Sequence, residues 1–164
     1  MMTDDELNAK YESGQNRVIQ EVDRIKLPAL FENIRSNPNY MKINNDSQSG
    51  VNWDEVKKSQ LIESFIINFP VMPIVVYKKL DYTYEVIDGK QRLKAIVDFY
   101  SNKLALNGLE IKTELNGCTY ATLPLKVKTE LNRHSLSLIT IIPEWDSSAE
   151  EIAKLIEVVA NRLN

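Results

Sequence analysis

The chain has 164 residues, of which 43% are hydrophobic and 26% are charged, and its net charge is −3. This length suits one globular domain with a core of its own, and the negative balance argues against a broad nucleic-acid surface, because affinity for DNA comes mainly from neutralising phosphates. No apolar run is long enough to cross a bilayer, the acidic start Thr3–Glu6 is unlike a signal peptide, and the single cysteine, Cys118, allows no internal disulfide. We therefore expect a cytoplasmic protein with no membrane partner.

Residues 1–43 are expected to form a helical and extended segment that packs on the rest of the chain. A weak helix is predicted over Asp4–Tyr11, and a second apolar pattern runs over Val18–Leu27. Polar turn and loop residues follow over Asn44–Gly50. We place the main domain over residues 44–164, within a single globular unit.

The middle of the chain predicts a helix followed by a β-hairpin. From Trp53 the apolar spacing is helical until Pro70, which closes the helix. Met72–Lys78 is a strand candidate whose apolar run is too continuous for a strand with one solvent-exposed face, and Tyr82–Ile87 pairs with it across a short turn. Beyond Gly89 the helical spacing of apolar residues resumes.

Three short apolar segments come next, at Leu104–Leu109, Ile111–Leu115 and Cys118–Tyr120. Asn-Gly pairs separate them, and such pairs favour tight turns between strands. These segments therefore predict a small β-meander.

The C-terminal part predicts a helix, a strand and a second helix. The first helix runs over Pro124–Leu131, and the β-branched strand covers Leu136–Ile142. The last helix is amphipathic over Ser148–Leu163, with Ser148 and Glu151 as its capping box. Together the elements predict a compact α+β domain with a small mixed sheet flanked by helices.

One short stretch carries most of the functional information: Val86-Ile87-Asp88-Gly89-Lys90-Gln91-Arg92-Leu93. A strand ends here and a helix begins after Gly89, and the unpaired N–H groups of a helix start suit a phosphate. Gly89 lets the backbone approach a ligand, Lys90 and Arg92 add cationic donors, and Asp88 suits a metal ion, a water or a ribose hydroxyl. The stretch is typical of a nucleotide-phosphate site, although Asp-Gly is also a common turn pair and these charges also occur as ordinary capping residues.

The chain resembles a known family in three segments taken together: Trp53–Phe65, Phe69–Ile74 and Val86–Leu93. They correspond to a tryptophan with a helix ending in Leu-Ile-Glu-Ser, an Ile-Pro-x-Pro strand entry and an Asp-Gly-Gln-Gln-Arg motif. This series is similar to the ParB-like domain at the N-terminus of GmrSD-type modification-dependent restriction enzymes and related phage-defence proteins. The resemblance runs from about Asn44 to the C-terminus, and it implies a ParB/sulfiredoxin-like fold and a nucleotide-binding module.

The resemblance also implies roles for individual residues. The implied catalytic residues are Asp88, Gln91 and Arg92, and the implied nucleotide-binding residues are Gln48, Asp88, Gly89, Lys90, Gln91 and Arg92. Asp88 would orient a metal-bound water or a ribose, the amides of Gly89 and Lys90 would hold phosphate, Gln91 would position the ligand, and Arg92 would neutralise charge. The implied ligand is a nucleoside triphosphate (NTP), with Mg²⁺ as a candidate cofactor. From the residues alone, no spacing requires Glu63 to share a Mg²⁺ ion with Asp88, and we rather expect Glu63 to help position the motif or to form a structural ion pair with Arg92.

Two positions depart from the family pattern. Lys90 stands where the family usually has glutamine, and a cation there tolerates phosphate. Ser49 stands where the family commonly has an arginine that helps to build the site, and a hydroxyl cannot replace a bidentate guanidinium contact. We therefore expect nucleotide binding with at most slow hydrolysis.

Other reactive residues give no second centre. His134 is the only histidine, so a histidine metal cluster or a Ser–His–Asp triad cannot form within one chain, and we expect it at a helix end. Cys118 has no obvious cationic neighbour that would activate its thiol. Trp53 is expected as a core anchor rather than as a platform for a base.

The sequence thus favours a nucleotide-binding regulatory module of a DNA restriction or phage-defence system, and it leaves two alternatives open. One is a degenerate family member that acts as a protein-interaction subunit or inhibitor, and the other is a ParB-like DNA-binding module. The His-Asn-His-type nuclease domain of larger family members has no counterpart in this chain, so we expect no DNA cleavage by it alone. Contact with DNA would come through a partner nuclease subunit.

Overall fold

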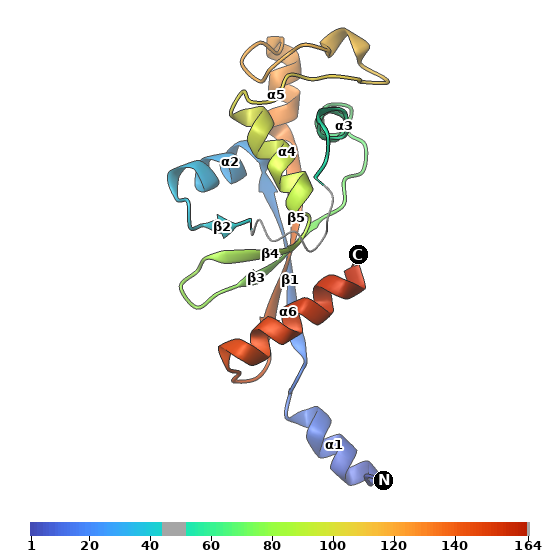
Figure 1. Ribbon diagram of the computed structural model, residues 1–164, viewed down its shortest axis with the longest axis vertical. Helices are drawn as coiled ribbons and strands as arrows, with labels where there is room; N and C mark the ends of the chain where they lie inside the picture. The colour runs from blue at the N-terminus through green and yellow to red at the C-terminus, as the bar shows by residue number, and fades with distance from the viewer. Residues whose placement is uncertain (44–51, 164) are drawn as a thin grey trace.

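The computed structural model describes residues 1–43 and 52–163, and within them helices lie on both faces of a five-stranded sheet (Figure 1). The strands are β1 (Val18–Lys26), β2 (Met41–Lys42), β3 (Ile74–Lys78), β4 (Tyr84–Asp88) and β5 (Ser135–Pro143), in the spatial order β1-β5-β3-β4-β2. β1 is antiparallel to β5 and β3 is antiparallel to β4, whereas the β5–β3 and β4–β2 pairs are parallel. The predicted α+β class and mixed sheet are confirmed.

The helices divide unequally between the two faces (Figure 1). They are α1 (Asp4–Glu12), α2 (Leu27–Ser36), α3 (Glu55–Ile66), α4 (Lys90–Tyr100), α5 (Leu125–Arg133) and α6 (Ala149–Leu163). Helices α2 to α5 contribute to the large core on one face, and α6 packs on the other face. In the described part of the chain, none of the helices combines the length and apolar composition that crossing a bilayer requires.

Strand β3 shows why the sheet is covered on both sides. Ile74 and Val76 belong to the large core, while Val75 and Tyr77 belong to the smaller cluster beneath α6. Successive side chains of a strand point to opposite faces, so a continuous apolar run requires cover on both. The predicted two-sided burial of this strand is confirmed, as is its hairpin with β4.

The N-terminal segment contributes a strand and a helix to the same sheet and core. β1 pairs with β5 along its whole length, from Val18 opposite Pro143 to Lys26 opposite Ser135. Leu27, which begins α2, is fully buried in the large core. By contrast, the predicted helix α1 is confirmed but buries no residue.

The predicted β-meander between α4 and α5 is wrong. Residues 104–123 form turns, one 3-10 turn (Thr113–Leu115) and irregular chain, with no strand among them. Some backbone donors of this segment bind backbone carbonyls, as Leu106 N–H does with the Cys118 carbonyl at 2.8 Å, and others bind side chains. Asn107 N–H donates to Ser59 Oγ at 3.0 Å, and Leu109 N–H donates to Asn116 Oδ1 at 3.0 Å. Its leucines fill the end of the large core, as the burial of Leu104, Leu106, Leu109 and Leu115 shows.

Candidate functional site

The turn that carries the Asp-Gly-Lys-Gln-Arg stretch joins the end of β4 directly to the start of α4. Asp88 is the last strand residue, Gly89 is the N-cap with φ +100°, and Lys90 begins the helix. The pairing of β3 with β4 is irregular between Val75 and Val76, opposite this end of the hairpin. No side chain of residues 1–43 or 52–163 caps α4, so within this part of the chain its first-turn N–H groups are open to an external acceptor.

Gly89 is required by both its conformation and its surroundings. A Cβ atom at this position would lie 3.0 Å from Arg92 Nη2 and 3.2 Å from two side-chain carbons of Ile74. A left-handed φ is also costly for any residue with a Cβ. The turn can therefore bring the backbone of the helix start against Arg92 only with glycine.

Arg92 ties the turn to the entry of β3. Its Nη2 donates to the carbonyl oxygen of Pro73 at 3.0 Å and to Asp88 Oδ2 at 3.2 Å. The side chains of Arg92 and Asp88 are 17% and 24% exposed, so this ion pair is largely shielded from solvent. Arg92 Nε is buried without a partner in the described structure, which leaves one donor of the guanidinium unused. Arg92 is thus a structural clamp as well as a cation at the site.

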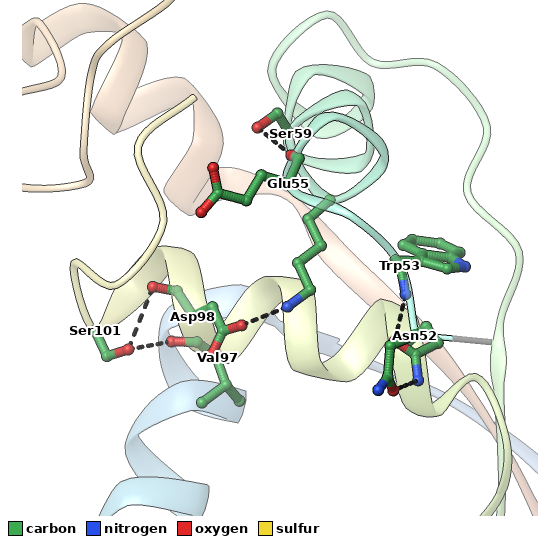
Figure 2. Close-up of polar contacts among 9 residues, drawn as sticks. Asn52, Trp53, Glu55, Ser59, Val97, Asp98 and Ser101 are labelled. Carbon is green, nitrogen blue, oxygen red and sulfur yellow. Dashed lines mark hydrogen bonds and ion pairs between the residues drawn. The ribbon is translucent and has the colours of Figure 1, made fainter. Parts of the chain in front are cut away.

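Gln91 uses both ends of its amide to hold the start of α3. Its Oε1 accepts from Trp53 N–H at 3.0 Å, and its Nε2 donates to Asn52 Oδ1 at 3.2 Å (Figure 2). Trp53 itself packs on the large core, with the Lys57 ammonium 4.9 Å from its ring centroid. The expected core role of Trp53 is confirmed.

An ion pair also joins α3 to the last turn of α4. Lys58 Nζ lies 2.8 Å from Asp98 Oδ2, and the two side chains are 19% and 33% exposed (Figure 2). Within α3, the buried Ser59 hydroxyl donates to the Glu55 carbonyl of the preceding turn at 2.6 Å. Helix α4 is therefore held near its start by the residues that precede α3 and near its end by Lys58 of α3.

Glu63 does not have the partner that the sequence predicted. Its side chain is 4% exposed, and its Oε2 accepts from Ile111 N–H at 3.1 Å and Lys112 N–H at 2.7 Å. Arg92 pairs with Asp88 instead. The predicted Glu63–Arg92 pair is wrong, because the irregular segment after α4 brings two backbone donors to the buried carboxylate, and these hold it.

These elements match one known family over most of the chain. A family model described as GmrSD restriction endonuclease, N-terminal domain, matches residues 27–163. The chain belongs to this family. Membership indicates a module of a restriction or phage-defence system. Searches of curated proteins and of solved structures give no match to this chain.

The family match starts earlier than the resemblance seen in the sequence. It begins at Leu27, the first residue of α2, rather than near Asn44. This start agrees with the structure, in which α2 and β2 belong to the same core and sheet as the rest of the GmrSD-type domain.

Of the residues predicted for the GmrSD-type site, Asp88, Gly89, Lys90, Gln91 and Arg92 lie together in the β4–α4 turn. Gln48, and Ser49 at the family arginine position, lie outside the described residues. Among the residues described, no group of three or more His, Cys, Asp or Glu side chains could hold a metal ion. Asp88 is the carboxylate of the turn, and one or two carboxylates together with ligand phosphates are a common arrangement for Mg²⁺.

Two contacts of the site could not be found from sequence motifs. The acceptor for Arg92 at β3 is the backbone carbonyl of Pro73, which carries no side-chain signal. The contact of Asn52 with Gln91 has no motif of its own, and the one hint in the sequence is that Asn52 directly precedes the tryptophan of the family pattern, Trp53.

His134 is the C-cap of α5, as expected, and its Nε2 lies 3.5 Å from Glu130 Oε1.

Proposed function

We propose that this domain is a nucleotide-binding regulatory module of its restriction or defence system. The observation that carries the proposal is the uncapped start of α4 at Gly89, with the side chain of Lys90 beside it. Within residues 1–43 and 52–163 the Lys90 ammonium makes no hydrogen bond or ion pair. A free cation next to open helix N–H groups suits a nucleotide phosphate.

The internal contacts of the motif favour binding over turnover. Gln91 and Arg92 are engaged with Asn52, Trp53, Pro73 and Asp88, so neither is free to move toward a reacting phosphate without losing contacts that hold the fold. We therefore propose slow NTP hydrolysis at most, with Mg²⁺ held by Asp88 and the phosphates. We also propose that contact with DNA is made through a partner nuclease subunit.

The test is a thermal-shift titration with ATP, GTP, CTP and UTP in the presence of Mg²⁺. Binding at about 100 times the dissociation constant stabilises a folded protein by roughly 2.7 kcal/mol. Lys90→Ala is expected to abolish most of the shift, because its side chain has no structural partner to lose. Lys103→Ala is the matched control, because it removes the same charge. Lys103 is an exposed lysine just beyond the other end of α4.

A shift that is equal in wild type, Lys90→Ala and Lys103→Ala would place the nucleotide elsewhere. If no nucleotide raises the melting temperature of the wild-type protein, the alternative function as an interaction subunit is favoured. That alternative is favoured by one observation, namely that the polar groups of Gln91 and the Nη2 of Arg92 serve the fold in this structure.

A further inference from the structure

We propose that the base of the bound nucleotide lies in a cleft between the β3–β4 hairpin and α6, while its phosphates stay at the start of α4. This inference rests on the proposed nucleotide binding and adds the location of the base. We call this space the α6 cleft. It has a volume of about 790 Å³, which lies within the range of roughly 300–1,000 Å³ found for small-molecule sites.

The α6 cleft lies between the β3–β4 hairpin on one side and α6 on the other. The hairpin and the first residue of α4 contribute Tyr77, Ile87 and Lys90, and α6 contributes Ile152, Ala153 and Ile156. Figure 1 shows α6 crossing the face of the sheet opposite to α3 and α4. The α6 cleft therefore lies on the opposite face of the sheet from Trp53, which packs against the large core.

Lys90 connects the α6 cleft to the candidate phosphate position. It is the first residue of α4 and it also lines the α6 cleft. A ligand with its phosphates at the helix start would thus have its remaining part directed along the side chain of Lys90. This continuity between the two positions is the main reason to place both ends of one nucleotide here.

The charges of the α6 cleft decide which end of the nucleotide enters it. Glu85 and Glu157 line it, and Asp81 lies at its hairpin end with Lys79. Carboxylates repel phosphate, so the interior disfavours the triphosphate and leaves Lys90 as the cation at the phosphate end. A neutral aromatic base avoids this repulsion.

The apolar side chains suit a flat base. Ile87 and Ile152 are 6% and 9% exposed, so their surfaces at the α6 cleft are firmly placed by packing. Burial raises the pKa of Tyr77, with Glu85 adding to the effect, so its phenol stays neutral and can lie against a ring. The alanine at position 153 leaves room that a large side chain would fill.

The experiment compares an NTP with inorganic tripolyphosphate, which has the phosphates but no base. Binding of the tightest of the four NTPs and of tripolyphosphate is measured by calorimetry with Mg²⁺. Ala153→Phe fills the α6 cleft, and we expect it to weaken NTP binding by about tenfold or more while tripolyphosphate binds as to wild type. Lys90→Ala should weaken both ligands.

Val158→Phe is the matched control, because Val158 lies on the same helix, is 43% exposed and does not line the α6 cleft. Urea unfolding of each variant shows whether it is folded. If Ala153→Phe is unfolded, Ala149→Phe enters the α6 cleft from the exposed start of α6 and replaces it.

Three outcomes overturn the inference. Unchanged NTP affinity in the cleft-filling variant places the base elsewhere and leaves the proposed nucleotide function standing. An equal loss for NTP and tripolyphosphate means that the substitution acts on the phosphate position and not on a base. Absence of binding by wild type to either ligand overturns the proposed function together with this inference.

Discussion

Arg92 combines the two possible uses of the β4–α4 turn, because its guanidinium is both a cation beside the helix start and a link between three backbone segments. The link to the Pro73 carbonyl and to Asp88 is largely shielded from water. A buried pair that loses one partner leaves the other charge uncompensated. The first effect of removing this side chain should therefore be on folding and only the second on ligand binding.

Arg92→Ala is expected to lower the free energy of unfolding by about 2 kcal/mol, since it removes two charge-assisted hydrogen bonds and isolates Asp88. The measurement is urea unfolding followed by circular dichroism. Arg35→Ala is the control, because Arg35 also pairs with a carboxylate, Glu32, but is 61% exposed, and it should leave the midpoint unchanged. Equal unfolding midpoints for the two variants would mean that the contacts of Arg92 do not stabilise the fold.

Gly89→Ala tests the other fixed point of the turn. The left-handed φ alone costs about 1–2 kcal/mol for alanine, and the close approach to Arg92 and Ile74 adds to this cost. Gly117→Ala separates the two effects, since Gly117 has φ +90° but a Cβ there would meet nothing within 4 Å. We expect a larger loss of unfolding free energy for Gly89→Ala, and equal losses would remove the packing argument.

At the scale of single residues, the sequence predicts the turn but not its contacts. Asp88, Gly89 and Lys90 are adjacent in the chain, so a strand end, a glycine and a helix start are enough to find them. The Gln91–Asn52 bond joins positions 39 apart, and the acceptor at Pro73 is a backbone atom. Such contacts depend on how the elements pack, and no local pattern encodes them.

Among the elements, the segment between α4 and α5 depends on side chains of α3 for its shape. Glu63 accepts two backbone hydrogen bonds from it while almost fully buried. Glu63→Ala should lower the free energy of unfolding by about 2–4 kcal/mol, because it removes two charge-assisted hydrogen bonds that hold the segment to α3. Glu114→Ala, at an exposed position of the same segment, is the control and should have little effect.

Hydrogen exchange gives this prediction a local measurement. The amides of Ile111 and Lys112 should lose protection in Glu63→Ala, while the amides at the middle of α4 stay protected. Uniform loss across the domain would instead indicate general destabilisation without a specific role for the carboxylate.

The start of α6 provides a pH-dependent test. Hydrogen bonds from the backbone and the hydroxyl of Ser148 lower the pKa of Glu151 below its ordinary value. A lowered folded-state pKa stabilises the fold above the ordinary pKa of the carboxyl, and this contribution is lost as the pH falls through the folded value. In Ser148→Ala, NMR titration should show the pKa of Glu151 rising only part of the way, because the backbone donor remains.

The contrast between α6 and the irregular segment shows which elements can be predicted. The capping box of α6 spans four neighbouring residues, so its signal is complete within the sequence. The Asn-Gly pairs of the irregular segment do mark turns, but Ser59 and Glu63 of α3 take three of its backbone donors, and these donors are then not available to a continuous strand ladder. A segment whose shape depends on side chains far away in the sequence shows no helical or strand periodicity of its own.

At the scale of the whole molecule, the family match and the physical domain differ at the N-terminus. The match begins at residue 27, whereas β1 ends at Lys26 and pairs with β5 over its full length. Ile25 also packs against the large core, and Val18 packs against the smaller cluster beneath α6. Helix α1, in contrast, lies away from the sheet and the core, and none of its residues is buried (Figure 1).

Two truncations follow from this difference. Deletion of residues 1–12 removes α1 and should change the free energy of unfolding by less than about 0.5 kcal/mol, as expected for exposed residues. Deletion of residues 1–26 also removes β1, and the lost ladder bonds and apolar contacts should cost on the order of 3 kcal/mol. It would also leave β5 as a bare edge, which invites association between copies. Urea unfolding and light scattering of both truncated chains check this prediction. If the chain without residues 1–26 is as stable and as monomeric as the chain without residues 1–12, β1 does not stabilise the domain. The family match would then mark the boundary of the domain.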